Sequence, residues 1–212
     1  LIGAVNLFAQ TPINSSTFGM MESRILGPGT MSGRISAIEG VNGDGKTIYV
    51  GTAGGGIWKT TNAGASFKPI FDKYCQSIGA LAINQKKPNI IYAGTGESNM
   101  RNSVSIGNGL YKSTDAGKTF DKILYINENT GCGDVAIDPE HPDTVYASTW
   151  EFRRKPYAFN SGGNGSGMWK SLDGGKTWKE LSNGLPKKPF GRIAFALAPS
   201  APQNLVAIVE SN

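Results

Sequence analysis

The chain has 212 residues, a formal net charge of +5 and 29 glycines, and only 17% of its residues are charged. This length is enough for one sizeable hydrophobic core, and the composition excludes a disordered or fibrous chain. Lys and Arg are scattered along the sequence without a polybasic block, so we expect no nucleic-acid partner.

The first ten residues, 1–10, resemble the end of a secretory signal peptide that runs into a small-residue cleavage zone near Ala9. An ordinary apolar strand or arm is the alternative. The signal-peptide interpretation predicts a secreted, periplasmic or cell-surface protein. Residues 11–31 carry Pro, Ser, Thr and Gly without periodicity and are expected to form an irregular lead-in. No other apolar stretch is long enough to span a membrane, so we expect no membrane span.

Residues 32–212 contain an eight-residue pattern three times, at intervals of 53 and 58 residues: Thr60–Phe67, Ser113–Phe120 and Ser171–Trp178. Each copy follows an apolar–aromatic pair and precedes an alternating run, which indicates strand, turn, strand. The third residue of each copy is Asn62, Asp115 or Asp173. Such side chains accept hydrogen bonds from backbone N–H groups nearby, and the following Gly tolerates positive φ. We therefore expect these three residues to brace turns.

Two further apolar runs precede each of these turns, and the same two runs occur once more near the end of the sequence. The first runs are 34–38, 78–83, 135–137 and 192–197, and the second runs are 47–52, 90–95, 144–149 and 204–209. Each unit thus has four short strands, A to D, and such units are typical of all-β propeller blades. The sequence predicts three antiparallel blades and the first half of a fourth. A propeller closes with at least four blades, so we expect the remaining blades to come from the same, longer chain; the alternative is that other chains supply them.

In an antiparallel four-stranded blade, the A–B and C–D turns lie on one face, and the B–C loops and D–A connections lie on the other. The B–C loops vary most in length, with residues 53–56, 96–108 and 150–166. Long loops on one rim of a rigid scaffold are common places for binding residues. We therefore expect function on the B–C face.

The pattern Ser-x-Asp-x-Gly-x-Thr-Trp resembles the Asp-box of sialidase-type, sortilin-type and xyloglucanase-type propellers. The segments 51–61, 94–105 and 150–163 resemble the bacterial sortilin-like Asp-box (BNR-repeat) propellers, many of which are labelled glycosyl hydrolases by similarity. The resemblance extends from about Gly27 to the end of the chain. It implies a large propeller, usually much longer than this chain.

The resemblance also bears on catalysis. Xyloglucanases of this superfamily place a catalytic Asp just after the first strand B, and Ala53 occupies that position here. Sialidases use an arginine in an Arg-Ile-Pro motif, which Arg34 and Arg192 echo without the Pro. Packing at the mouth of the central channel explains both arginines better.

Two functions from different classes remain open. The favoured one is a propeller that binds a protein or glycan partner, and the alternative is a glycoside hydrolase, which needs two carboxyl groups across the scissile bond. Candidate carboxylates are Glu97, Asp134 and Glu151, although pairing with arginines of the same rim would also explain them. No metal or cofactor is expected, because no His, Cys and acid cluster has metal spacing. Candidate ligand-binding residues, beside Met100, are Arg101, Trp150, Arg153, Arg154, Tyr157, Phe159 and Arg192.

Residues 150–159 are expected to be the centre of recognition, because Trp150, Phe152, Tyr157 and Phe159 lie in what the sequence indicates is a loop. Arginine and aromatic side chains are enriched at binding hot spots. The alternative is that this loop caps its own blade.

Cys75 and Cys132 both fall in D–A connections on the same face. They fit either one disulfide or two free thiols.

Overall fold

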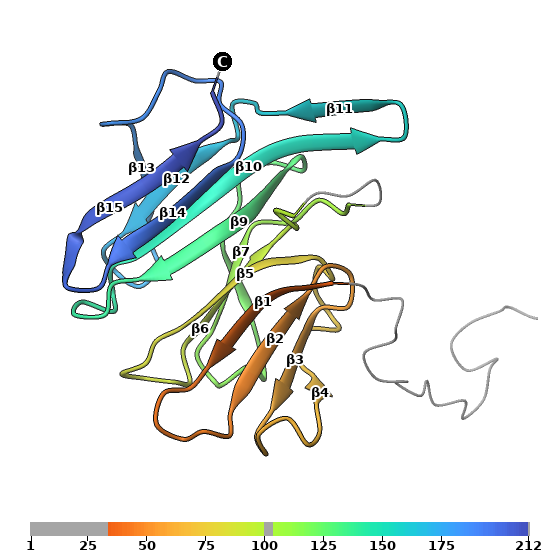
Figure 1. Ribbon diagram of the computed structural model, residues 1–212, viewed down its shortest axis with the longest axis vertical. Coiled ribbons are helices and arrows are strands. Elements are labelled where there is room, and N and C mark those ends of the chain that lie inside the picture. The colour runs from red at the N-terminus through yellow and green to blue at the C-terminus, as the bar shows by residue number, and fades with distance from the viewer. Residues whose placement is uncertain (1–33, 100–103, 212) are drawn as a thin grey trace, which may run out of the picture.

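The computed structural model describes residues 34–99 and 104–211, and this part of the chain contains strands and no helix (Figure 1). The predictions for residues 1–31, Met100 and Arg101 lie outside the described residues.

The first two sheets are complete four-stranded antiparallel blades, with their strands in sequence order. The first contains β1 (Ile35–Gly40), β2 (Ile48–Thr52), β3 (Ile57–Thr60) and β4 (Lys68–Pro69). The second contains β5 (Ile78–Ile83), β6 (Ile91–Thr95), β7 (Leu110–Ser113) and β8 (Asp121–Leu124).

The third sheet has five strands, because one long strand pairs with β-strands on both sides and also forms a hairpin at its end. Its members are β9 (Thr130–Ile137), β10 (Val145–Lys155), β11 (Ala158–Ser161), β12 (Gly167–Ser171) and β13 (Lys179–Leu181). The fourth sheet has two strands, β14 (Ile193–Ala198) and β15 (Ala201–Val209). The predicted all-β architecture of three blades and half of a fourth is confirmed.

The first strand of every blade lies next to the first strand of the following blade. β1 contacts β5, β5 contacts β9, and β9 contacts β14, so the sheets fan out from a common inner edge (Figure 1). The predicted faces also agree with the hydrogen bonds. Ala63 N–H donates to the Lys46 carbonyl between two turns on one face, whereas Gly56 N–H donates to the Gln76 carbonyl on the other.

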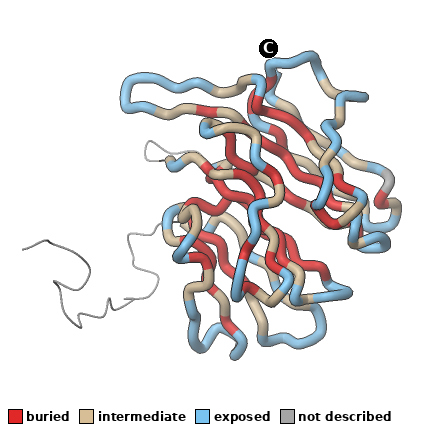
Figure 2. The backbone as a smooth tube through the Cα atoms, turned by 180° about the vertical axis from the view of Figure 1, so that it is seen from behind, coloured by how far each residue is buried: buried red, intermediate tan, exposed pale blue. Residues whose placement is uncertain are grey.

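The core lies between adjacent blades, where the backbone of the inner strands is buried (Figure 2). Between blades one and two, the Phe71 ring meets the Tyr111 and Phe120 rings edge to face, with centroids 5.4 and 4.8 Å apart. Such pairs add to the burial of apolar area. Between blades two and three, Gly94 of β6 allows the close approach of β9, because a Cβ there would lie 2.7 Å from the Cys132 carbonyl oxygen. The Gly of strand B thus lets the next blade pack closely.

The structure corrects the prediction for residues 150–155. They form a continuation of β10 and not a loop, so Trp150 and Phe152 have a strand to pack on. Both side chains are buried and their rings stack with centroids 4.4 Å apart. The loop that follows strand B therefore begins beyond Lys155, at the tip of the β10–β11 hairpin.

Both cysteines are free thiols, so the alternative of a disulfide between Cys75 and Cys132 is wrong. Cys132 is fully buried in the core between blades two and three, and burial raises the pKa of its thiol to about 12. A thiol in such an environment is unreactive, because the thiolate is the reactive form.

Candidate functional site

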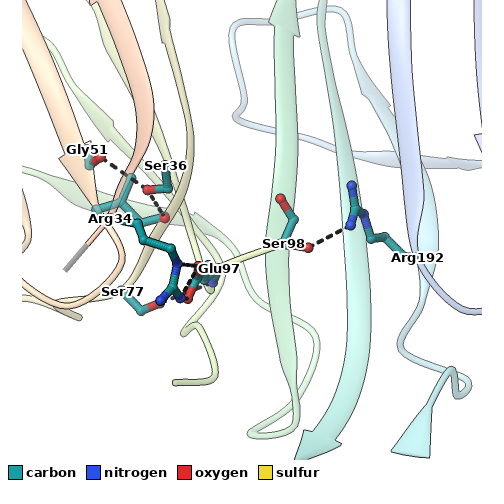
Figure 3. A network of polar contacts seen from close by, with 8 residues as sticks. Arg34, Ser36, Gly51, Ser77, Glu97, Ser98 and Arg192 are labelled. Carbon is teal, nitrogen blue, oxygen red and sulfur yellow. Dashed lines mark hydrogen bonds and ion pairs between the residues drawn. The ribbon is translucent and has the colours of Figure 1, made fainter. Parts of the chain in front are cut away.

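Charged side chains from three blades meet where the inner strands begin, on the face of the B–C loops (Figure 3). Arg34 directly precedes β1, Glu97 and Ser98 follow β6, and Arg192 directly precedes β14. We call these four residues the inner rim. Their positions follow from the topology, because the starts of strands A and the ends of strands B share one face.

Arg34 and Glu97 form an ion pair between blades one and two. The Arg34 Nε atom donates to Glu97 Oε1 at 2.8 Å, and Nη2 contacts both carboxylate oxygens. Glu97 is 1% exposed, and its backbone N–H donates to Ser77 Oγ at 3.1 Å. A two-pronged guanidinium–carboxylate contact is among the stronger and more directional ones in proteins. Glu97 is therefore engaged by Arg34.

Arg192 contacts the same segment from the other side. Its Nη1 atom donates to the Ser98 carbonyl oxygen at 2.8 Å, and its backbone N–H donates to Glu210 Oε2 at 2.9 Å. Glu210 Oε2 also accepts from Ser161 Oγ at 2.6 Å. Residues 97 and 98 are thus held between arginines of the first and fourth blades (Figure 3).

Asp134 lies deeper on β9 and joins it to the fourth blade. Its Oδ1 accepts from Val135 N–H at 3.0 Å, and its Oδ2 accepts from Phe195 N–H at 3.1 Å. Burial raises the pKa of this carboxyl group, and the two hydrogen bonds and the charge of Arg192 oppose the rise. A half-buried acid of this kind can serve as a structural link or as a proton donor.

Glu151 closes the B–C loop of blade three. Its Oε2 accepts from Gly165 N–H at 2.7 Å, while its own N–H donates to Ser166 Oγ at 3.0 Å. All three candidate carboxylates therefore already accept hydrogen bonds from protein groups, which suits a structural role.

The β10–β11 hairpin carries the other sequence-predicted ligand residues (Figure 1). Lys155 pairs with Ala158 and Arg154 with Phe159, so only Pro156 and Tyr157 form the loop. Tyr157 is 82% exposed and Phe159 is 44% exposed.

Cations accompany these exposed rings. The Lys155 Nζ atom lies 5.9 Å from the centroid of the Tyr157 ring, and Arg154 Cζ lies 5.9 Å from that of Phe159. Arg153 donates through Nη2 to the Glu128 carbonyl oxygen at 3.3 Å. The predicted ligand-binding aromatic residues therefore differ in exposure. Tyr157 and Phe159 are exposed at the tip of the hairpin, whereas Trp150 is buried at its base and donates to Ser161 Oγ at 3.1 Å.

The three turn residues lie on the opposite face and hold their turns closed. Asp173 Oδ1 accepts from Lys176 and Thr177 N–H at 2.9 Å each, and Oδ2 accepts from Thr177 Oγ1 at 2.6 Å. Asp115 makes the equivalent contacts with Lys118 and Thr119. Hydrogen bonds from Thr177 lower the pKa of Asp173, and those from Thr119 lower the pKa of Asp115.

Asn62 makes a similar turn in blade one. Its Oδ1 accepts from Ser66 N–H at 2.9 Å, and its Nδ2 donates to Ser66 Oγ at the same distance. An amide can therefore replace the carboxylate at this position.

Two classes of site find no support in the described residues. Residues 34–99 and 104–211 contain no group of three His, Cys, Asp or Glu side chains arranged to hold a metal ion. The same residues include no helix of the length and hydropathy that crossing a membrane requires.

The sequence did not reveal the partners of the inner rim. Arg34 and Glu97 are 63 residues apart, and Glu210 was not a candidate. The sequence offered only the positions of these residues. The residue before strand A of one blade and the second residue after strand B of the following blade lie on the same rim.

The architecture resembles that of three solved glycoside hydrolases. A GH74 xyloglucanase from Xanthomonas campestris matches with a TM-score of 0.59 and 18% identity over 84% of this chain and 26% of its own. A Niastella koreensis GH74 enzyme matches with 0.57 and 19%, over 76% and 23%. An ancestral GH74 enzyme matches with 0.55 and 18%, over 77% and 20%.

These similarities show the fold, which is that of a β-propeller, and this chain spans about a quarter of the length of each neighbour. No protein-family model and no curated protein sequence matches the chain.

Proposed function

We propose that this chain is part of a β-propeller that captures a glycan through the tip of the β10–β11 hairpin. The observation that carries the proposal is the exposure of Tyr157 and Phe159 beside Lys155 and Arg154. Large aromatic groups cost free energy when they are left in water, and exposed ones often mark an interaction surface. A flat ring flanked by cations suits stacking against a sugar ring and hydrogen bonding to its hydroxyl groups.

The wider identity follows from the repeated turns together with the fold. We infer a sortilin-like Asp-box propeller that is secreted, periplasmic or displayed on the cell surface. The contacts of the inner rim fix the blades relative to one another, and the hairpin binds the ligand. A protein is the alternative ligand for the same surface, and the experiment below distinguishes a protein ligand from a glycan.

The remaining blades are proposed to belong to the same, longer chain. Ile35 and Ile38 are exposed on the first blade, and Val206 and Ile208 are exposed on the last one. Apolar sheet faces of this kind are covered by neighbouring sheets in layered β folds. The last sheet also has only two strands, where its predecessors have at least four.

A glycoside hydrolase is the second candidate, and one observation favours it. Burial raises the pKa of Asp134, which is the direction that a general acid needs. Replacing Asp134 by Asn would abolish hydrolysis of a xyloglucan oligosaccharide if the chain were catalytic. The engagement of Glu97 by Arg34 and of Glu151 by Gly165, together with Ala53 at the xyloglucanase position, makes binding the better account.

The test measures binding to a glycan panel that includes xyloglucan, since one structural neighbour is named as a xyloglucanase. The variant Tyr157→Ala/Phe159→Ala should lose capture, while its melting temperature should stay within about 2 °C, because exposed side chains contribute little to stability. Leu172→Ala is the matched control. Leu172 is 69% exposed in a turn on the opposite face, and its removal should leave capture unchanged.

Three results would count against the proposal. The double variant could bind as well as the wild type, or Leu172→Ala could weaken capture equally. Capture of a purified protein with no glycan bound, lost in the same double variant, would replace the glycan by a protein ligand.

A further inference from the structure

A tyrosine of strand B and a lysine of strand C face each other on every complete blade. In each pair the two residues are direct cross-strand partners. The three pairs are Tyr49–Lys59, Tyr92–Lys112 and Tyr146–Lys170. In this order, the lysine Nζ atom lies 5.2, 5.5 and 5.1 Å from the centroid of the tyrosine ring.

The first pair holds a carbonyl group of the next blade. Lys59 Nζ donates to the Ala116 carbonyl oxygen at 2.9 Å, and the Tyr49 hydroxyl donates to it at 3.4 Å. Ala116 is the residue after Asp115 in the turn, and its φ of 60° lies in the left-handed region. This conformation is costly for a residue with a Cβ and is kept where surrounding contacts maintain it.

The second pair repeats the arrangement one blade later. Lys112 Nζ donates to the Gly174 carbonyl oxygen at 2.7 Å, and the Tyr92 hydroxyl donates to it at 3.1 Å. Gly174 follows Asp173 and has a φ of 70°. Two blades thus use the same pair of donors for the same position of the following turn.

We call the place where a turn packs against the Tyr–Lys pair of the preceding blade its seat. An apolar side chain completes each seat. A Cβ built on the turn glycine Gly117 would lie 2.6 Å from the Ile70 side chain, and one on Gly175 would lie 2.6 Å from that of Ile123. Both isoleucines stand three residues after the aromatic residue that ends their own blade's turn. A Cβ on either glycine would have to displace this isoleucine methyl group, and the φ values of 89° and 93° favour glycine at both positions. Leu181 holds the same position in blade three.

The third pair has no carbonyl to hold. Within residues 34–99 and 104–211, the Lys170 ammonium group and the Tyr146 hydroxyl make no hydrogen bond or ion pair. They line a groove of about 360 Å³ together with Leu181, Leu205 and Val209. Leu181 forms the apolar side as Ile70 and Ile123 do, and Leu205 and Val209 belong to β15, the second strand of the next blade.

We propose that this groove is the seat for the C–D turn of the fourth blade, a segment of the same chain that follows β15. The turn has the sequence type of Ser113–Phe120 and Ser171–Trp178. Its residue after the Asp or Asn is left-handed, and the carbonyl of this residue accepts from both Lys170 Nζ and the Tyr146 hydroxyl. The same chain is the source because each filled seat takes its turn from the next blade, and β14 and β15 already begin that blade against the groove. This inference rests on the proposed continuation of the chain and not on glycan capture.

The test extends the full chain after Asn212 with the missing half of a blade. A copy of Gly167–Leu181 is joined through the shortest B–C connection of the protein, Ala53–Gly56, or through the same connection lengthened by two glycines. Native lysines are acetylated and quantified by mass spectrometry. The reactivity of Lys170 should fall about fivefold in the extended protein, the factor expected for one hydrogen bond. Lys59 and Lys112 should react equally in both proteins, since their seats are already filled.

A second extension carries Gly175→Val in the copied segment and serves as the matched control. A valine at that position would crowd the apolar side chain of the seat, and the φ of 93° disfavours it. The turn should therefore not bind, and Lys170 should stay as reactive as in the parent protein. Lys170 that is unprotected with both linkers would overturn the proposal. So would equal protection by the Gly175→Val extension, or a Lys170 already protected in the parent. Parental protection that grows with protein concentration would assign the groove to the Thr60–Phe67 turn of a second copy. Glycan capture is measured separately and does not enter this comparison.

Discussion

At the scale of residues, the charged groups of this chain act mainly as fasteners between strands that are distant in sequence. Glu97 is buried, so its carboxylate depends on the partner that replaces its lost hydration. Arg34 supplies that partner from the neighbouring blade. Removing one member of a buried pair is costly, whereas replacing both by apolar residues is often neutral.

We therefore predict that Arg34→Met lowers the free energy of unfolding by about 3 kcal/mol, because it leaves a buried carboxylate unpaired. The double variant Arg34→Met/Glu97→Met should return to within about 1 kcal/mol of the wild type. Urea unfolding of the two variants measures both values. Equal losses in the single and double variants would show that the ion pair does not tie the blades together.

The turn acids predict a dependence of stability on pH. Hydrogen bonds lower the pKa of folded Asp173 below its unfolded value, which is near 3.9. The unfolded state therefore binds the proton more readily, so the stabilisation is complete above about pH 5 and is lost as the pH falls through 4 and below. Asp173→Ala should melt at a lower temperature than the wild type at pH 7, and the difference should shrink below about pH 4.

Asp173→Asn is the control for this prediction, because Asn62 forms the same turn with an amide. It should lose less stability than Asp173→Ala at pH 7, and its melting temperature should lack the acid dependence that Asp173 gives the wild type. A gap between wild type and Asp173→Ala that is constant from pH 7 to pH 2 would disprove the role of the ionised carboxylate.

At the scale of elements, β10 is where the sequence was most misleading. The sequence predicts a B–C loop over residues 150–166, because these residues lie between two strand patterns. Trp150 and Phe152 alternate with Glu151 and Arg153, and this period of two is what extends the strand. Such short alternation is ambiguous until the packing partner is known.

Trp150→Ala should therefore lower the free energy of unfolding by about 3 to 5 kcal/mol, because it leaves a cavity beside Phe152. Tyr157→Ala should change it by less than about 0.5 kcal/mol, since that side chain is exposed. Thermal or urea unfolding of the two variants decides the matter. If the two losses were similar in size, the assignment of Trp150 to the core would be wrong.

The blades themselves could be predicted because their signals are local. Asp115 and Asp173 with their glycines fix the turns, and the apolar runs fix the strands on either side. The inner rim could not be predicted, because the contact of Arg34 with Glu97 depends on how two blades pack. The free state of Cys75 and Cys132 likewise depends on tertiary placement. The sequence placed Cys132 in a D–A connection, whereas it lies in strand β9 and is buried in the core.

At the scale of the whole molecule, the blades are arranged around a common inner edge, and the molecule has two different faces. One face carries the three turns and the exposed Leu172, and the other carries the inner rim and the projecting hairpin (Figure 1). Rigid sheets thus present a short, exposed hairpin at a fixed place. This division of roles is common in β-propellers and other scaffolds whose loops bind ligands.

Hydrogen–deuterium exchange with and without the captured glycan tests this central claim most directly. The account predicts added protection in residues 153–160, with no change in residues 171–178 of the opposite face. Protection confined to the turn face, or spread evenly over both faces, would contradict it.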